Sequence, residues 1–442
     1  MLFWWQADMK EFMKRNGSFG RLGGALVALI VLTLVLAPDA WAQSKYKTLH
    51  KFAGGTDGRL PKGGLVLDST GNLYGTTTSG GTHTWGTVFK LAPNSDGSWT
   101  ESVLHNFADR PDGEVPIAGL IFDQAGNLYG TTCEGGAGGQ GAVFELSPNL
   151  DGSWTESVLY SFCSLSNCVD GEVPIAGLIF DQAGNLYGTT WQGGAGGQGA
   201  VFELSPNLDG SWTESVLHSF MGSDGADPAA SLIFDLAGNL YGTTYLGGVS
   251  GKRYVGQTLG VVFRLTPQQN GTWKESVLHR FVGTDGANPH GGLAFDQAGN
   301  LYGTTSNAGS CKVDNSGCGT VFQLTPNADG SWKEKVLHHF RVTANGAFPW
   351  AGLIFDQTGN LYGTTYGGGN PTHCPRDFFG CGVVFKLAPD SKGGWSESVV
   401  HRFVDDPGAE PFGGLIFDTA GNLYGTTRVG FSTFGSVFEI TP

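Results

Sequence analysis

Basic residues are scarce in this chain of 442 residues. Lysine and arginine together number 25, against 39 aspartates and glutamates, which leaves a formal net charge of −14. No stripe of basic residues offsets this deficit, so the sequence argues against nucleic acid and anionic membranes as partners. A helical hydrophobic period is also missing from the repeated part of the chain, which argues against a helical domain.

Long apolar runs are scarce as well. The run at residues 25–37 has 13 residues broken only by Thr33, too few to span a bilayer comfortably. Lysine and arginine precede it and Ala40-Trp41-Ala42 follows, an order typical of a secretory signal peptide cleaved after Ala42. The sequence therefore predicts a signal peptide at residues 1–42. The mature chain is expected to be exported (secreted, extracellular or periplasmic), with no membrane span.

Glycine is abundant, and much of it belongs to the phrase Gly-Asn-Leu-Tyr-Gly-Thr-Thr. This phrase occurs seven times, beginning at Gly71, Gly126, Gly184, Gly238, Gly299, Gly359 and Gly421. Intervals of 54 to 62 residues are typical of a solenoid or a propeller. Each copy holds four short segments rich in β-branched and aromatic residues, separated by turn signals, as at 119–123, 127–132, 141–146 and 154–162. These segments predict four strands in each repeat.

The copy numbers of the four segments predict how the ring closes. The first three segments occur seven times each, but the fourth follows only six of them. Its seventh copy lies at the other end of the chain, at residues 46–52. An N-terminal strand that completes the last blade as its outermost strand leaves no open edge. The sequence therefore predicts an all-β fold over residues 43–442, a seven-bladed β-propeller with four strands per blade.

The repeated phrase also resembles a known family. Leu-x-x-Asp-x-x-Gly-Asn-Leu-Tyr-Gly-Thr-Thr, followed by Gly-x-Val-Phe-x-Leu, is similar to the GloVer tandem repeat of proteins described as choice-of-anchor tandem repeat GloVer-containing. The resemblance covers all seven copies. It implies export and attachment through a C-terminal anchor, and it implies no particular activity. The sequence departs from this pattern at Ile440-Thr441-Pro442, where no apolar tail or sorting signal stands, so attachment is not expected.

Six of the seven cysteines lie in close pairs: Cys163 with Cys168, Cys311 with Cys318, and Cys374 with Cys381. In an exported chain they predict three local disulfides. A zinc site is the weaker alternative, because His373 is the one imidazole near these pairs, and no metal or other cofactor is predicted. Cys133 is left over, either as a buried thiol or as a reactive one.

Aspartate and histidine recur at framework positions. The aspartates that open the inner turns are interpreted as turn caps rather than calcium ligands, because no oxygen-rich loop follows them; they are Asp68, Asp123, Asp181, Asp235, Asp296, Asp356 and Asp418. Six histidines share one position in the fourth strand, where the second copy has Tyr160 instead. A role shared by histidine and tyrosine is packing plus a hydrogen bond.

Function is expected where the copies differ. The loops between blades and the loops between second and third strands share one face, and variable loops on a rigid scaffold commonly bind ligands. Polar and aromatic residues gather there in blades five, six, seven and one: Lys62, His290, Trp350, Tyr366, His373, Arg376, Phe412 and Arg428. Aromatic rings with a few polar groups suit a sugar or another small polar ligand. The alternative is that these residues are unrelated surface substitutions.

Three functions fit this sequence. The leading hypothesis is a secreted, monomeric binding or interaction scaffold whose partner is a glycan or a cell-surface protein, because no catalytic constellation recurs. The second is an extracellular hydrolase or lyase acting on carbohydrate at the channel mouth, with Glu114, Glu172 and Glu410 as its carboxylates. The third is a structural component of the cell surface.

Overall fold

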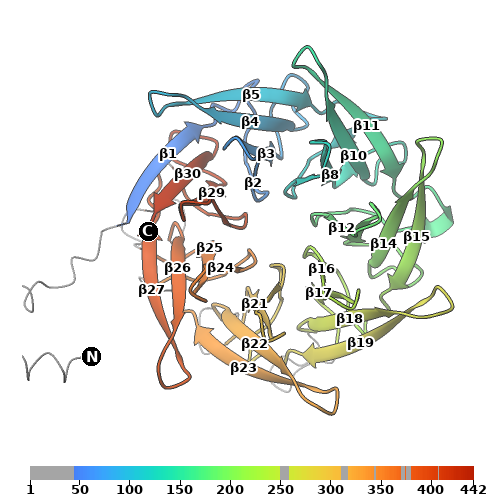
Figure 1. Ribbon diagram of the computed structural model, residues 1–442, viewed down its shortest axis with the longest axis vertical. Coiled ribbons are helices and arrows are strands. Elements are labelled where there is room, and N and C mark those ends of the chain that lie inside the picture. Colours follow the sequence, from blue (N-terminus) through green and yellow to red (C-terminus); the bar gives the residue numbers. More distant parts are fainter. Residues whose placement is uncertain are drawn as a thin grey trace, which may run out of the picture. The chain divides into compact units, whose positions relative to one another are not determined.

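A computed structural model describes residues 44–248, 258–309, 317–342, 345–369, 374, 380–406 and 408–442. Within these residues, seven antiparallel four-stranded sheets stand as blades around a ring (Figure 1). The predicted seven-bladed β-propeller is therefore confirmed. The predicted signal peptide lies outside the described residues. Among the described residues, no helix is long and apolar enough to cross a membrane.

Each blade runs from a two-residue inner strand to a long outer strand. From the centre outwards, blade one comprises β2 (Val66–Leu67), β3 (Leu73–Thr77), β4 (Thr87–Pro93) and β5 (Trp99–Asn106), and blade two comprises β7 (Ile121–Phe122), β8 (Leu128–Thr132), β10 (Ala142–Pro148) and β11 (Trp154–Ser161). Blade three comprises β12 (Ile179–Phe180), β13 (Leu186–Thr190), β14 (Ala200–Pro206) and β15 (Trp212–Ser219), and blade four comprises β16 (Ile233–Phe234), β17 (Leu240–Thr244), β18 (Val261–Pro267) and β19 (Trp273–Arg280). Blade five comprises β20 (Ala294–Phe295), β21 (Leu301–Thr305), β22 (Thr320–Pro326) and β23 (Trp332–His339), and blade six comprises β24 (Ile354–Phe355), β25 (Leu361–Thr365), β26 (Val383–Pro389) and β27 (Trp395–Arg402). A short pair, β6 (Gly113–Glu114) with β9 (Glu134–Gly135), and a 3-10 turn at Ser166–Cys168 lie in the loops.

Blade seven joins the two ends of the chain. It comprises β28 (Ile416–Phe417), β29 (Leu423–Thr427), β30 (Ser436–Thr441) and, outermost, β1 (Lys45–Lys51). β1 pairs antiparallel with β30, so that Lys45 lies opposite Thr441 and Lys51 opposite Ser436. Figure 1 shows β1 beside β30 at the rim of the ring. The closure predicted from the copy numbers is confirmed.

The middle of each blade is packed too tightly for any side chain at the glycine of Leu-Tyr-Gly-Thr-Thr. A Cβ atom at Gly75 would lie 2.7 Å from the ring of Phe89 and 2.9 Å from Leu65. Phe89 itself is fully buried. The same approach recurs at the corresponding glycine of every blade, for example at Gly130 against Phe144. The recurring glycine is therefore a packing requirement of the scaffold.

The inner turns confirm the interpretation of the seven aspartates as turn caps. Asp68 accepts hydrogen bonds from the backbone N–H groups of Thr70 and Asn72, both at 2.9 Å, and from Tyr74 Oη at 3.0 Å. Bonds from the asparagine four residues on, through its backbone and its side chain, recur in all seven turns. Burial alone would raise the pKa of Asp68, but the bonds from Asn72 and Thr70 lower that pKa to about 2.

The outer histidines also hold the frame together. His105 Nε2 lies 3.1 Å from Asp112 Oδ2 in the loop that leads to the next blade, and Tyr160 Oη donates to Asp170 Oδ2 at 2.9 Å in the following copy. Three histidines, His105, His218 and His279, thus share with Tyr160 a contact to a loop aspartate, whereas the Nε2 atoms of His50 and His338 make no hydrogen bond within the described residues. At the last junction Tyr46 stacks on His401, with ring centroids 4.1 Å apart.

Half-buried glutamates on the outer strands make stability depend on pH. Burial, together with a neighbouring aspartate charge, raises the pKa of Glu101, Glu156, Glu214 and Glu275 to about 7, and one oxygen of each has no hydrogen-bond partner among the described residues. A raised folded pKa means that the folded protein holds a proton that the unfolded chain releases near pH 4.5. These glutamates therefore lower the free energy of unfolding as the pH rises from about 4.5 to about 7.

Glu214→Gln is expected to stabilise the protein at pH 8 and to change little at pH 4.5. Glutamine keeps the shape of the side chain and removes the buried charge, which is present only above the raised pKa. Thermal unfolding at the two pH values measures the effect. Glu134→Gln, at an exposed position, is the matched control. A gain of the same size at both pH values would contradict the titration of Glu214.

Candidate functional site

A ring of residues with a strained backbone precedes the prolines of the crossing loops. The residue before each crossing-loop proline has a left-handed backbone, with φ of 57° or 58°: Leu60, Val115, Val173, Asp227, Asn288, Phe348 and Glu410. The N–H of Phe348 donates to the carbonyl of Cys318 at 2.8 Å, and its carbonyl accepts the N–H of Tyr366 at 2.9 Å. Non-glycine residues adopt this backbone only where surrounding bonds impose it. These strained residues therefore fix the positions of two neighbours in each blade. One is the residue after the proline, and the other is the residue after Gly-Thr-Thr.

Five side chains from blades four to seven form what we call the aromatic cluster: Tyr245, His290, Trp350, Tyr366 and Phe412. Trp350 lies at its centre, with ring centroids 4.6 Å from His290, 4.9 Å from Phe412 and 6.1 Å from Tyr366. His290 also contacts Phe412 at 5.9 Å and Tyr245 at 6.2 Å. All five side chains are half-buried. Residues predicted to share one sector are thus brought into mutual contact, and each still presents part of its surface.

Two cations border the aromatic cluster. The Lys62 ammonium lies 5.7 Å from the centre of the Phe412 ring, and the Arg428 guanidinium lies 5.8 Å from that of Tyr366. Arg428 Nη2 donates to Tyr366 Oη at 3.2 Å, and Arg428 Nε donates to Glu410 Oε2 at 2.8 Å. Burial, and then the charge of Arg428, lower the pKa of Lys62. Arg428 is neutralised by Glu410, so Lys62 carries the uncompensated positive charge of this group.

His290 contributes a neutral ring to the aromatic cluster. Burial lowers its pKa to about 4, so the imidazole is uncharged at neutral pH. A neutral imidazole has one donor and one acceptor nitrogen, which suits hydroxyl groups. His290 is therefore suited to hydrogen bonding with a ligand and not to charge pairing.

Sequence reasoning missed part of this site. Tyr245 belongs to blade four, outside the predicted sector, yet its ring contacts His290. Trp191 extends the line of rings into blade three, 5.5 Å from Tyr245. Both residues stand directly after Gly-Thr-Thr, and a comparison of this position among the seven copies shows that they are aromatic. The predicted sector does not include blades three and four, because the residues after the proline in these blades, Ile175 and Ala229, are aliphatic.

Residues 39–257 and 254–442 match the Gloeobacter/Verrucomicrobia repeat family. The chain belongs to this family. No curated protein matches it. The family resemblance expected from the repeated phrase is therefore confirmed over nearly the whole described ring, and it brings no assigned activity.

The cysteines of this repeat-family protein follow the prediction where they are described. Cys163–Cys168 and Cys374–Cys381 are disulfides. Cys318 is disulfide-bonded as well, and its predicted partner Cys311 lies outside the described residues. The predicted site residues His373 and Arg376 also lie outside the described residues.

Cys133 is a free and buried thiol. Burial raises its pKa to about 12. Because the thiolate is the reactive form, this cysteine is unreactive at neutral pH. One group of potential metal ligands in the described residues joins Cys163 and Cys168 with Glu172, but both sulfurs are already bonded to each other.

The three glutamates considered for an enzyme do not occupy equivalent positions. Glu410 itself holds the strained position before Pro411 and binds Arg428. Glu114 and Glu172 stand one residue earlier, before the strained valines. Glu114 is buried, and burial followed by the charges of nearby acidic residues raises its pKa. The described structure thus gives each glutamate its own local setting rather than a common role.

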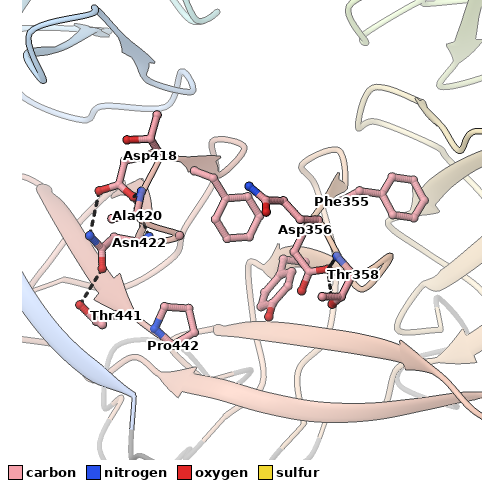
Figure 2. A pocket seen from close by; sticks show the side chains of 13 residues that line it. Phe355, Asp356, Thr358, Asp418, Ala420, Asn422, Thr441 and Pro442 are labelled. Atoms are coloured by element: carbon pink, nitrogen blue, oxygen red, sulfur yellow. Dashed lines mark hydrogen bonds between the residues drawn. The ribbon is translucent and has the colours of Figure 1, made fainter.

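The opposite face of the repeat-family ring carries hollows between adjacent blades. Figure 2 shows one of about 430 Å³ between blades six and seven, lined among others by Phe355, Asp356, Asp418 and Pro442. The Asp418 carboxylate of this hollow is already hydrogen-bonded within its inner turn, because Asn422 Nδ2 donates to it at 2.8 Å. Thr441 in turn donates to the Asn422 side-chain oxygen at 2.9 Å. The polar groups here serve the scaffold, which makes the aromatic cluster the stronger candidate site.

Proposed function

We propose that this protein is an exported binding scaffold that takes a sugar ring, or a similar small polar ligand, on the aromatic cluster. The observation that carries the proposal is the contact of rings from four blades at one place, half-buried and bordered by Lys62 and Arg428. The disulfides support export, because such bonds persist in oxidising compartments.

The chemistry of the cluster suits a carbohydrate. A sugar ring has one apolar face that packs on aromatic rings and hydroxyl groups that need hydrogen-bond partners at its edge. Trp350 provides the largest apolar surface of the cluster. The neutral His290 ring and the Lys62 ammonium provide polar groups beside it. The strained ring holds these side chains in place before a ligand arrives, which lowers the entropy lost on binding.

A glycan array probed with the mature protein tests this function. We expect binding to a restricted set of glycans that share one sugar, and the bound sugar should compete in free form. Incubation of the protein with the same glycans, followed by analysis of the products, tests the alternative of a hydrolase or lyase. Cleavage would replace the proposal by an enzymatic one, and an array without any binding would contradict a glycan as the ligand.

A further inference from the structure

A second hollow has Arg428 in its wall. It measures about 190 Å³ and is formed by the loops of blades six and seven, with these residues in its wall: Cys374, Gly380, Cys381, Asp405, Ala409, Glu410, Arg428 and Val429. Two of its acidic residues, Asp405 and Glu410, are more than nine-tenths buried. A carboxylate in such a place needs a partner.

Within the described residues, one oxygen of the Asp405 carboxylate has no such partner. Its Oδ2 atom is buried and makes no hydrogen bond within the described part of the chain. At the junction between blades four and five, by contrast, both carboxylate oxygens of the crossing-loop aspartate have partners: Asp285 accepts from Val282 N–H and lies 2.9 Å from His279 Nε2. The neighbouring Asp406 is exposed and accepts from Ser432 Oγ at 2.8 Å. Within the described residues, Asp405 Oδ2 therefore takes no part in the hydrogen bonds that hold the blades together.

The charges around the hollow favour a cationic guest. Glu410 and Arg428 neutralise each other in an ion pair, and among the described residues that line the hollow no other cation faces Asp405. A buried carboxylate of this kind is stabilised by a group that carries a positive charge and several N–H donors. The volume suits a small group, and Ala409, Val429 and the disulfide provide apolar walls for the carbon that bears it.

We propose that this hollow binds a primary ammonium group, with Asp405 as its counter-ion. A compact ammonium fits this hollow better than a guanidinium does. The planar fork of a guanidinium binds best to both oxygens of one carboxylate at once, and Oδ2 of Asp405 is buried. An amino sugar and a simple alkylamine both carry this group. The proposal does not rest on the aromatic cluster, since the wall of the hollow contains none of its five rings.

Calorimetric titration of the mature protein with three small probes tests the proposal. D-Glucosamine and ethanolamine carry the ammonium, whereas N-acetyl-D-glucosamine keeps the sugar ring and lacks the charge. We expect the two amines to bind and the acetylated sugar to bind at least about tenfold more weakly at this site. Binding of glucosamine without ethanolamine would identify an amino sugar as the source of the ammonium group.

Two variants make the result specific. Asp405→Asn is expected to weaken amine binding about tenfold or more while leaving the melting temperature unchanged or raised, because it removes an unpaired buried charge. Asp406→Asn is the matched control and should bind amines as the parent does. Equal binding of the acetylated sugar, tighter binding of Ca²⁺ than of either amine, or full amine binding by Asp405→Asn would overturn the proposal. Trp350→Ala should leave ethanolamine binding intact, which separates this site from the aromatic cluster.

Discussion

Removal of residues 43–53 is expected to open the ring and to produce a protein that unfolds or aggregates. The deletion takes away β1, leaves β30 as an unpaired edge, and removes Phe52, which is 1% exposed. Loss of a buried phenylalanine alone costs about 3–5 kcal/mol, a large part of a typical total of about 5–15 kcal/mol. Thermal unfolding and size-exclusion chromatography measure the outcome.

Two controls separate the effect of losing β1 from the effect of losing the Phe52 side chain. Phe52→Ala keeps β1 and should lower the melting temperature without causing association. A synthetic peptide of residues 43–53, added to the shortened protein, should restore part of the lost stability by pairing with β30. A shortened protein as stable and monomeric as the parent would show that β1 is dispensable for closure.

Trp350→Ala is expected to abolish most ligand binding with little change in the fold. Trp350 contacts His290, Phe412 and Tyr366 at the half-buried mouth, so the substitution removes the centre of the aromatic cluster. A loss of about tenfold or more in affinity for the sugar found on the array is expected, because one stacked ring at a binding hot spot contributes about 2 kcal/mol. Titration calorimetry measures the affinity.

Trp212→Ala is the control for this substitution. Trp212 packs on Tyr129 of the neighbouring blade, with ring centroids 6.4 Å apart, and belongs to the repeated frame. Its removal is expected to lower the melting temperature by several degrees and to spare binding. If Trp350→Ala lowers the melting temperature as much as Trp212→Ala and leaves affinity unchanged, the aromatic cluster is ordinary packing and the ligand binds elsewhere.

The fold could be predicted from the sequence because the evidence for it is repeated. Seven copies of one phrase establish the blade, and the displaced copy at residues 46–52 establishes the closure. The left-handed residues before the prolines could not be predicted. Leucine, valine and phenylalanine at these positions carry no signal for positive φ, and a following proline restricts the backbone in another direction. Hydrogen bonds from two adjacent blades impose this geometry, and they form only when those blades pack together.

The candidate site was predictable in part for the same reason. Comparison of copies finds residues that differ, so it placed Trp350, His290 and Phe412 in one sector, and their contacts agree with that grouping. It cannot show which side chains reach across a blade boundary, and Tyr245 does so. Asp405 could not be recognised in the sequence because most crossing loops contain an aspartate; the lack of a hydrogen-bond partner for its Oδ2 among the described residues distinguishes it.

The pairing of β1 with β30 also governs the order in which the molecule can be completed. Lys45 and Thr441 lie at opposite ends of the described chain, so the first strand of the ring pairs only after its last strand has been synthesised. Contacts between residues so distant in sequence form late, because the chain between them must first be ordered. Until then the ring has two open strand edges, which can pair with other chains. The ring is therefore most open to pairing with other chains when all seven blades have formed and β1 has not yet paired with β30.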